Sequence, residues 1–82
     1  MNLASVPLQT TWRVRSVTAN TAQPDKARQL EEIGFLPGEL VSVLTHGFPG
    51  GDPLVVRIGL STFALRRAEA ECVEVETKAL HA

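Results

Sequence analysis

The amino-acid sequence predicts a small, mostly β domain with one short helix, folded as a closed or partly open barrel. Two observations lead to this class. The first is a series of short apolar or alternating stretches, typical of strands. They span residues 11–17, 40–44, 54–58, 61–66 and 72–76. The second is that only the segment 20–34 has clear helical spacing of apolar residues. Barrel closure protects the edges that a flat sheet would expose.

Length and composition fit one ordinary globular domain. The chain has 82 residues, of which 44% are hydrophobic and 21% are charged, close to the average for folded domains. We expect a single domain over 1–82, with a loose N-terminal arm at about 1–7 and a frayed tail at about 77–82. No apolar stretch approaches the ~20 residues of a membrane span, and no signal peptide is recognisable. These features predict a cytoplasmic protein without direct membrane insertion.

The charge balance argues against nucleic acid as a partner. The chain has 8 Lys and Arg residues against 9 Asp and Glu residues, a net charge of −1, whereas non-specific nucleic-acid binding depends on clustered positive charge. Cys72 is the single cysteine, and a lone thiol fits a reducing compartment. On an alternating strand it falls opposite Val73 and Val75, which predicts a partly exposed, non-catalytic thiol.

The first strand and the helix have distinct local signals. Trp12 and Val14 alternate with arginines within "TWRVRSV" (11–17), as in a half-buried strand. In the expected helix, Leu30 and Ile33 lie about one turn apart on an apolar face. Gly34 then suits the left-handed conformation that ends many helices. Because so short a helix is marginal in water by itself, its apolar face must dock on the strands.

Two turn-rich segments follow the helix. Pro37 and Gly38 predict a type II turn, since proline suits its first central position and glycine its second. The loop 46–53 then holds 3 of the 6 glycines. It is either a rigid recognition loop or a plain hairpin connection whose glycines meet backbone requirements. Residues 67–71 predict a short helical turn before the last strand.

The apolar residues of the helix and the strands predict the core. We expect these side chains to be buried: Leu30, Ile33, Phe35, Leu40, Val43, Leu54, Val56, Phe63, Leu65, Val73 and Val75. Phe48 is the exception, because it lies among turn residues and cannot easily reach this core. An exposed aromatic side chain is typical of an interface anchor.

Taken in order, these stretches resemble the FeoA family of small bacterial proteins. The resemblance rests on "RQLEEIGFLPGELVSVL" (28–44), "GGDPLVVRIG" (50–59) and "FALRRAEAECVEV" (63–75). Each motif alone is weak, but the ordered set is specific. The family resemblance implies an SH3-like β-barrel and a role in bacterial Fe(II) uptake.

The implied function is that of a non-enzymatic accessory protein. By resemblance, its partner is the membrane transporter FeoB, contacted from the cytoplasm at the GTP-binding portion. The alternative is a divalent-metal-binding regulatory domain, like the C-terminal SH3-like domain of iron-dependent repressors. The chain has no paired acid and base, no nucleophile elbow and no phosphate-binding glycine loop, so an enzyme is not predicted. Self-association stays open.

The candidate partner-binding residues are exposed features of the loop and the neighbouring strands: Phe48, Pro49, Asp52, Arg57 and Arg66. Pairing of the strands 54–58 and 61–66 would place Arg57 and Arg66 on one outer face. Arginine there could bind acidic groups of a partner through bidentate contacts. The plainer interpretation is a solvated face balanced by nearby glutamates, and Asp52 has its own alternative, a cap on a turn.

Metal binding is a separate hypothesis, carried by His46, Asp52 and His81. Strong sites show paired spacings such as CxxC or HxxxH, and the sequence has neither. We therefore expect no required cofactor. A weak, adventitious divalent ion, Fe(II) or Zn(II), is the form of metal binding that these residues favour.

Overall fold

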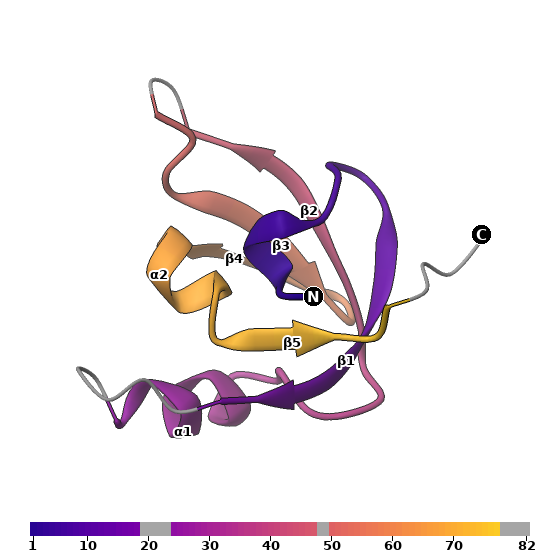
Figure 1. Ribbon diagram of the computed structural model, residues 1–82, viewed down its shortest axis with the longest axis vertical. Coiled ribbons are helices and arrows are strands. Elements are labelled where there is room, and N and C mark those ends of the chain that lie inside the picture. The colour runs from indigo at the N-terminus through magenta and orange to yellow at the C-terminus, as the bar shows by residue number, and fades with distance from the viewer. Residues whose placement is uncertain (19–23, 48–49, 78–82) are drawn as a thin grey trace.

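The computed structural model describes residues 1–18, 24–47 and 50–77. Its elements in chain order are η1 (Leu3–Ser5), β1 (Thr11–Val17), α1 (Lys26–Glu32), β2 (Leu40–His46), β3 (Leu54–Ile58), β4 (Ser61–Leu65), α2 (Arg67–Ala70) and β5 (Val73–Val75) (Figure 1). The five strands, the one longer helix and the short turn of helix before the last strand confirm the predicted order of elements.

The strands form one antiparallel sheet in the order β4-β3-β2-β1-β5. β1 serves two neighbours, because Thr11–Arg13 pair with β2 and Val14–Val17 pair with β5. Register shifts interrupt β1 between Val14 and Ser16 and β2 between Val43 and Thr45. Such irregularities bend a strand and increase its twist, which curls the sheet around its apolar face (Figure 1).

The N-terminal segment is part of the core, so the prediction of a loose arm at residues 1–7 is wrong. Leu3 has 0% exposure and Val6 is also buried. The Asn2 side chain accepts a hydrogen bond from the Ala4 N–H at 3.0 Å and so caps η1. Asn2 also forms an isolated β-bridge with Glu74, the middle residue of β5. The sequence gives no local sign of this burial, because residues 1–7 have no helical or strand periodicity and Leu3 and Val6 are buried by contact with distant elements.

Helix α1 is shorter than the predicted segment 20–34, of which residues 20–23 lie outside the described residues. Leu30 is its buried residue. Gly34 has a φ of 121°, as predicted for a helix end. The Phe35 N–H then donates to the Leu30 carbonyl at 3.0 Å, and the Phe35 ring is fully buried.

The turn that follows α1 has the predicted type II character. Gly38 has a φ of 94°, a value that glycine adopts at little cost. The Glu39 N–H donates to the Leu36 carbonyl at 3.0 Å and closes the turn. The chain therefore passes from the docked helix directly into β2.

Most of the predicted core is confirmed, with two errors. Leu30, Phe35, Val43, Leu54, Val56, Leu65, Val73 and Val75 are buried, and Phe63 is partly buried against them. Ile33 is 41% exposed and Leu40 is 44% exposed. Both lie at element ends, Ile33 just after the last residue of α1 and Leu40 at the first residue of β2. There the periodicity of the element no longer determines which way a side chain points.

We predict that Leu3→Ala lowers the free energy of unfolding by about 2–5 kcal/mol, the usual range for truncating a buried leucine. Urea unfolding followed by Trp12 fluorescence measures it. Leu8→Ala is the matched control, because Leu8 is exposed, and it should change stability little. Equal stability of the two variants would contradict the burial of the N-terminal segment.

Candidate functional site

The loop 46–53 has a narrow base. The Gly47 N–H donates to the Pro53 carbonyl at 2.8 Å, and the Gly51 N–H donates to the Gly47 carbonyl at 2.9 Å. A Cβ on Gly47 would lie 2.5 Å from the Asp52 carbonyl oxygen, so only glycine fits there without movement of the backbone. Gly47 therefore meets a backbone requirement, as expected if the loop is a plain hairpin connection. Phe48 and Pro49, two candidate partner-binding residues, lie outside the described residues.

Asp52 binds the backbone of a different element. Its Oδ1 accepts a hydrogen bond from the Arg67 N–H at 3.0 Å, at the first residue of α2. The carboxylate thus caps a helix 15 residues along the chain instead of its own turn. A carboxylate at a helix N-terminus also interacts favourably with the helix dipole. Asp52 is exposed, but part of its hydrogen-bonding capacity is already used within the fold.

Arg67 is the residue that the sequence analysis missed. Its Nη1 donates to the Ala4 carbonyl at 3.2 Å, and its Nη2 donates to the Gly51 carbonyl at 3.1 Å. One guanidinium therefore joins η1 to the loop 46–53. Nothing in "LRR" distinguishes Arg67 from its neighbour Arg66, so the local pattern held no signal for this role.

Arg57 and Arg66 are both exposed but do not form a cluster. Arg57 pairs with Thr62 on β4, whereas Arg66 follows Leu65, the last residue of that strand. The two register positions are four residues apart, which corresponds to about 13 Å along a strand. Their side chains lie on the same side of the β3–β4 ladder, but they are too far apart to bind one carboxylate of a partner together.

The three candidate metal ligands are not brought together. His46 lies beside the loop, with its Nδ1 3.6 Å from the place where a Cβ on Gly51 would be. Asp52 is engaged by Arg67, and His81 lies outside the described residues. Within the parts of the chain that the structure describes, no three His, Cys, Asp or Glu side chains are grouped as metal ligands.

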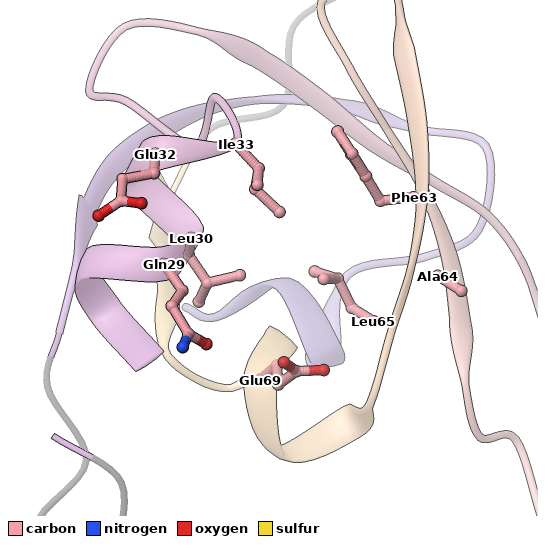
Figure 2. Close-up of a pocket in the computed structure, with 8 residues that line it drawn as sticks. All are labelled: Gln29, Leu30, Glu32, Ile33, Phe63, Ala64, Leu65 and Glu69. Atoms are coloured by element: carbon pink, nitrogen blue, oxygen red, sulfur yellow. The ribbon is translucent and has the colours of Figure 1, made fainter. Parts of the chain in front are cut away.

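A groove lies between α1, β4 and α2, on a surface that the sequence analysis did not single out. It has a volume of about 370 Å³ and is lined by Gln29, Leu30, Glu32, Ile33, Phe63, Ala64, Leu65 and Glu69. Figure 2 shows Ile33, the residue just after α1, and Phe63 of β4 pointing into the same space. The Phe63 ring also packs on Phe35, with 6.4 Å between ring centroids. Half-exposed Ile33 was expected in the core, and it is instead one wall of this groove.

Glu69 forms the charged end of the groove. Its Oε2 lies 3.0 Å from Lys26 Nζ, an ion pair between α2 and α1. Its Oε1 accepts a hydrogen bond from the Arg66 N–H at 2.8 Å. Partial burial opposes ionisation, but the Arg66 hydrogen bond and the Lys26 charge outweigh it and lower the pKa of Glu69. The groove therefore has a carboxylate at this end at neutral pH.

Cys72 is buried, with 6% exposure, so the prediction of a partly exposed thiol is wrong. β5 begins only at Val73, and Cys72 belongs to the turn after α2, where the alternation does not apply. Burial raises the pKa of the thiol, and the charges of Glu71 and Glu69 raise it further. A protonated, buried thiol is a poor nucleophile.

A family model of the FeoA domain matches residues 1–77. The chain belongs to the FeoA family. This confirms the family resemblance that its motifs indicated. Among solved structures, Stenotrophomonas maltophilia FeoA, complexed with zinc, is 43% identical with a TM-score of 0.84, covering 93% of this chain and 89% of that one. That protein is described as a prokaryotic SH3 domain protein and a candidate ferrous iron transport activating factor.

Two further solved structures share this fold. FeoA from Chlorobium tepidum is 32% identical with a TM-score of 0.76, covering 92% of this chain and 68% of that one. A manganese-dependent transcriptional repressor is 24% identical with a TM-score of 0.73, covering 92% of this chain and 40% of that one. The repressor match concerns the fold alone. The predicted SH3-like fold is thus confirmed for this FeoA-family chain.

A search of curated proteins gave no match. In the described residues, no helix has the length and apolar character that a membrane crossing requires.

We predict that Arg67→Lys lowers the free energy of unfolding by about 1 kcal/mol, because a lysine cannot reach both carbonyls with one planar fork. Urea unfolding measures the change. Arg66→Lys is the matched control on the exposed neighbour and should be nearly neutral. If Arg66→Lys destabilised the protein as much, the assigned role of Arg67 would be wrong.

Proposed function

We propose that this FeoA-family chain is a non-enzymatic accessory protein that assists bacterial Fe(II) uptake. Its partner is the cytoplasmic GTP-binding portion of the transporter FeoB, and it acts in the cytoplasm. The observation that carries the proposal is the match to Stenotrophomonas FeoA, which extends over 93% of one chain and 89% of the other. That protein's description as a candidate activating factor supports the same role here.

An accessory protein of this kind acts by unequal binding. A protein that binds two states of a transporter equally shifts neither state, however tightly it binds. The proposal therefore requires a docking surface that distinguishes the states of FeoB. Rigid features suit this task because they resist adapting to both states. The hydrogen-bonded base of the loop 46–53 is such a feature.

The proposed loop-side surface consists of Phe48, Pro49, Asp52, Arg57 and Arg66, and Arg57 is one of its three charged residues. It lies in a polar row across four strands, formed by Thr11, Ser42, Arg57 and Thr62. No ion pair of Arg57 joins it to another described residue. Its full charge is therefore available to acidic groups of a partner.

We predict that Arg57→Glu reduces capture of the FeoB GTP-binding portion by about tenfold, because a charge reversal places like charges across the interface. Co-purification of the two soluble proteins, with Fe(II) uptake in cells, measures it. Arg15→Glu, an exposed arginine on β1, is the matched control, and Phe48→Ala probes the loop tip.

Two results decide this proposal. If the wild-type chain does not capture FeoB and does not raise uptake, the accessory role is wrong. If the wild type binds and both Arg57→Glu and Phe48→Ala behave like it, the loop-side surface is wrong while the role stands.

Metal sensing is the second candidate function, favoured by the zinc complex of the 43% identical relative. A regulatory domain would need a strong divalent site, whereas we propose only weak Fe(II) or Zn(II) binding at His46, Asp52 and His81. Calorimetric titration of the apoprotein with Zn(II) should therefore show weak heat or none. Sub-micromolar binding that His46→Ala abolishes would establish the sensing function instead.

A further inference from the structure

The two edge strands of the sheet, β5 and β4, differ in whether another segment covers them. β5 is covered, because Asn2 bridges to Glu74 and the Val75 N–H donates to the Met1 carbonyl at 2.9 Å. β4 ends the sheet on the other side. In the residues that the structure describes, no strand pairs with its outer edge. An uncovered edge presents backbone donors and acceptors that pair readily with another extended chain.

The free groups of β4 follow from its pairing with β3. Ile58 and Ser61 flank the two-residue turn and form the closing pair of the hairpin, which is a hydrogen-bonded pair in such hairpins. Antiparallel pairs alternate between bonded and non-bonded, so Phe63 and Leu65 also bond to β3. The N–H and C=O groups of Thr62 and Ala64 therefore point to the outer edge.

The groove lies over the face of β4 that carries Phe63 and Leu65. Successive residues of a strand point to opposite sides of the sheet, and Figure 2 shows Phe63 and Leu65 directed toward α1 and Ala64 directed away from it. A strand added beside β4 would place every second side chain on this same face, next to Phe63. Ile33, 41% exposed, forms the opposite wall at the C-terminal end of α1, and Figure 2 shows its side chain directed into the gap that it shares with Phe63. An apolar slot thus lies next to unpaired backbone.

The charge of the groove indicates the chemistry of its occupant. Two acidic residues, Glu32 and Glu69, and no basic residue are among those that line it, and Figure 2 shows the Glu32 carboxylate at the outer rim of α1 rather than between Ile33 and Phe63. Lys26 of α1 is already paired with Glu69. Lysine or arginine beside an apolar side chain would complement such a lining.

We propose that the groove binds an extended peptide segment, which adds to β4 as a further strand, inserts one bulky apolar side chain between Ile33 and Phe63, and places Lys or Arg near Glu32. This mode is β-strand addition, in which backbone hydrogen bonds supply affinity and a side-chain slot supplies specificity. The assignment of this segment to the transporter rests on the proposed function. A proline-rich ligand does not fit, since proline has no N–H to pair with the edge.

The first test uses a capped Lys-Val-Leu-Val-Lys peptide and amide NMR of the whole chain. Addition of the peptide should shift the Thr62, Ala64 and Ile33 signals and slow hydrogen exchange at the Thr62 and Ala64 amides by about tenfold or more. The Phe63 and Leu65 amides, already bonded to β3, should change little. Control peptides with Glu in place of Lys, or Ser in place of Leu, should bind more weakly.

Two variants separate the edge from the slot. Ala64→Pro removes the outward N–H and leaves the bonds to β3, because edge strands tolerate proline at that position, while Ala64→Val keeps the N–H as its matched control. Ile33→Asp places a like charge in the slot, and Leu36→Asp, an exposed residue that does not line the groove, is its control. Ala64→Pro and Ile33→Asp should each weaken peptide binding and FeoB capture by at least about tenfold.

The outcomes distinguish this proposal from the proposed function. Unchanged Thr62 and Ala64 exchange with the peptide would overturn strand addition, whether or not FeoB binds. Wild-type-like FeoB capture by Ile33→Asp and Ala64→Pro would overturn the groove as the transporter site. Dimers of the chain alone that Ile33→Asp abolishes would identify a second copy as the occupant and overturn the assignment to FeoB.

Discussion

The guanidinium of Arg67 joins the segments that close this small fold. It donates to the Ala4 carbonyl of η1 and to the Gly51 carbonyl of the loop, while the Arg67 backbone N–H donates to the Asp52 carboxylate. Leu3 can stay buried because η1 is held against α2, and the covered edge of β5 depends in turn on the residues before η1. In a chain of this size, where the core is small, one well-placed donor can fix segments that are distant in sequence.

Features set by near neighbours could be predicted from the sequence. The end of α1 at Gly34, the burial of Phe35 and the turn at Gly38 all depend on local backbone preferences. The five strands followed from alternation and turn residues. Errors came where an element ends, as at Ile33 and Cys72, because periodicity says nothing about the residue just beyond a helix or just before a strand.

The candidate site was harder to predict, since its features come from tertiary contacts. Leu3 and Arg67 have roles only because separate segments meet around them. The groove at Ile33 and Phe63 is invisible in the sequence, where both read as ordinary core residues. The position of Ile33 at the end of an amphipathic helix, where periodicity stops, was the one sequence signal that could have marked it. Phe48, Pro49 and His81 lie outside the described residues, so their predicted roles rest on the sequence.

The narrow base of the loop 46–53 has a consequence for how such proteins diversify. Gly47 is hydrogen-bonded to both Gly51 and Pro53, so these bonds hold the two ends of the loop together at its base. Whatever lies between Gly47 and Gly51 can lengthen at little cost, since doubling the length of a flexible loop costs only about 0.6 kcal/mol. Insertions at that tip should therefore leave the scaffold beneath it unchanged.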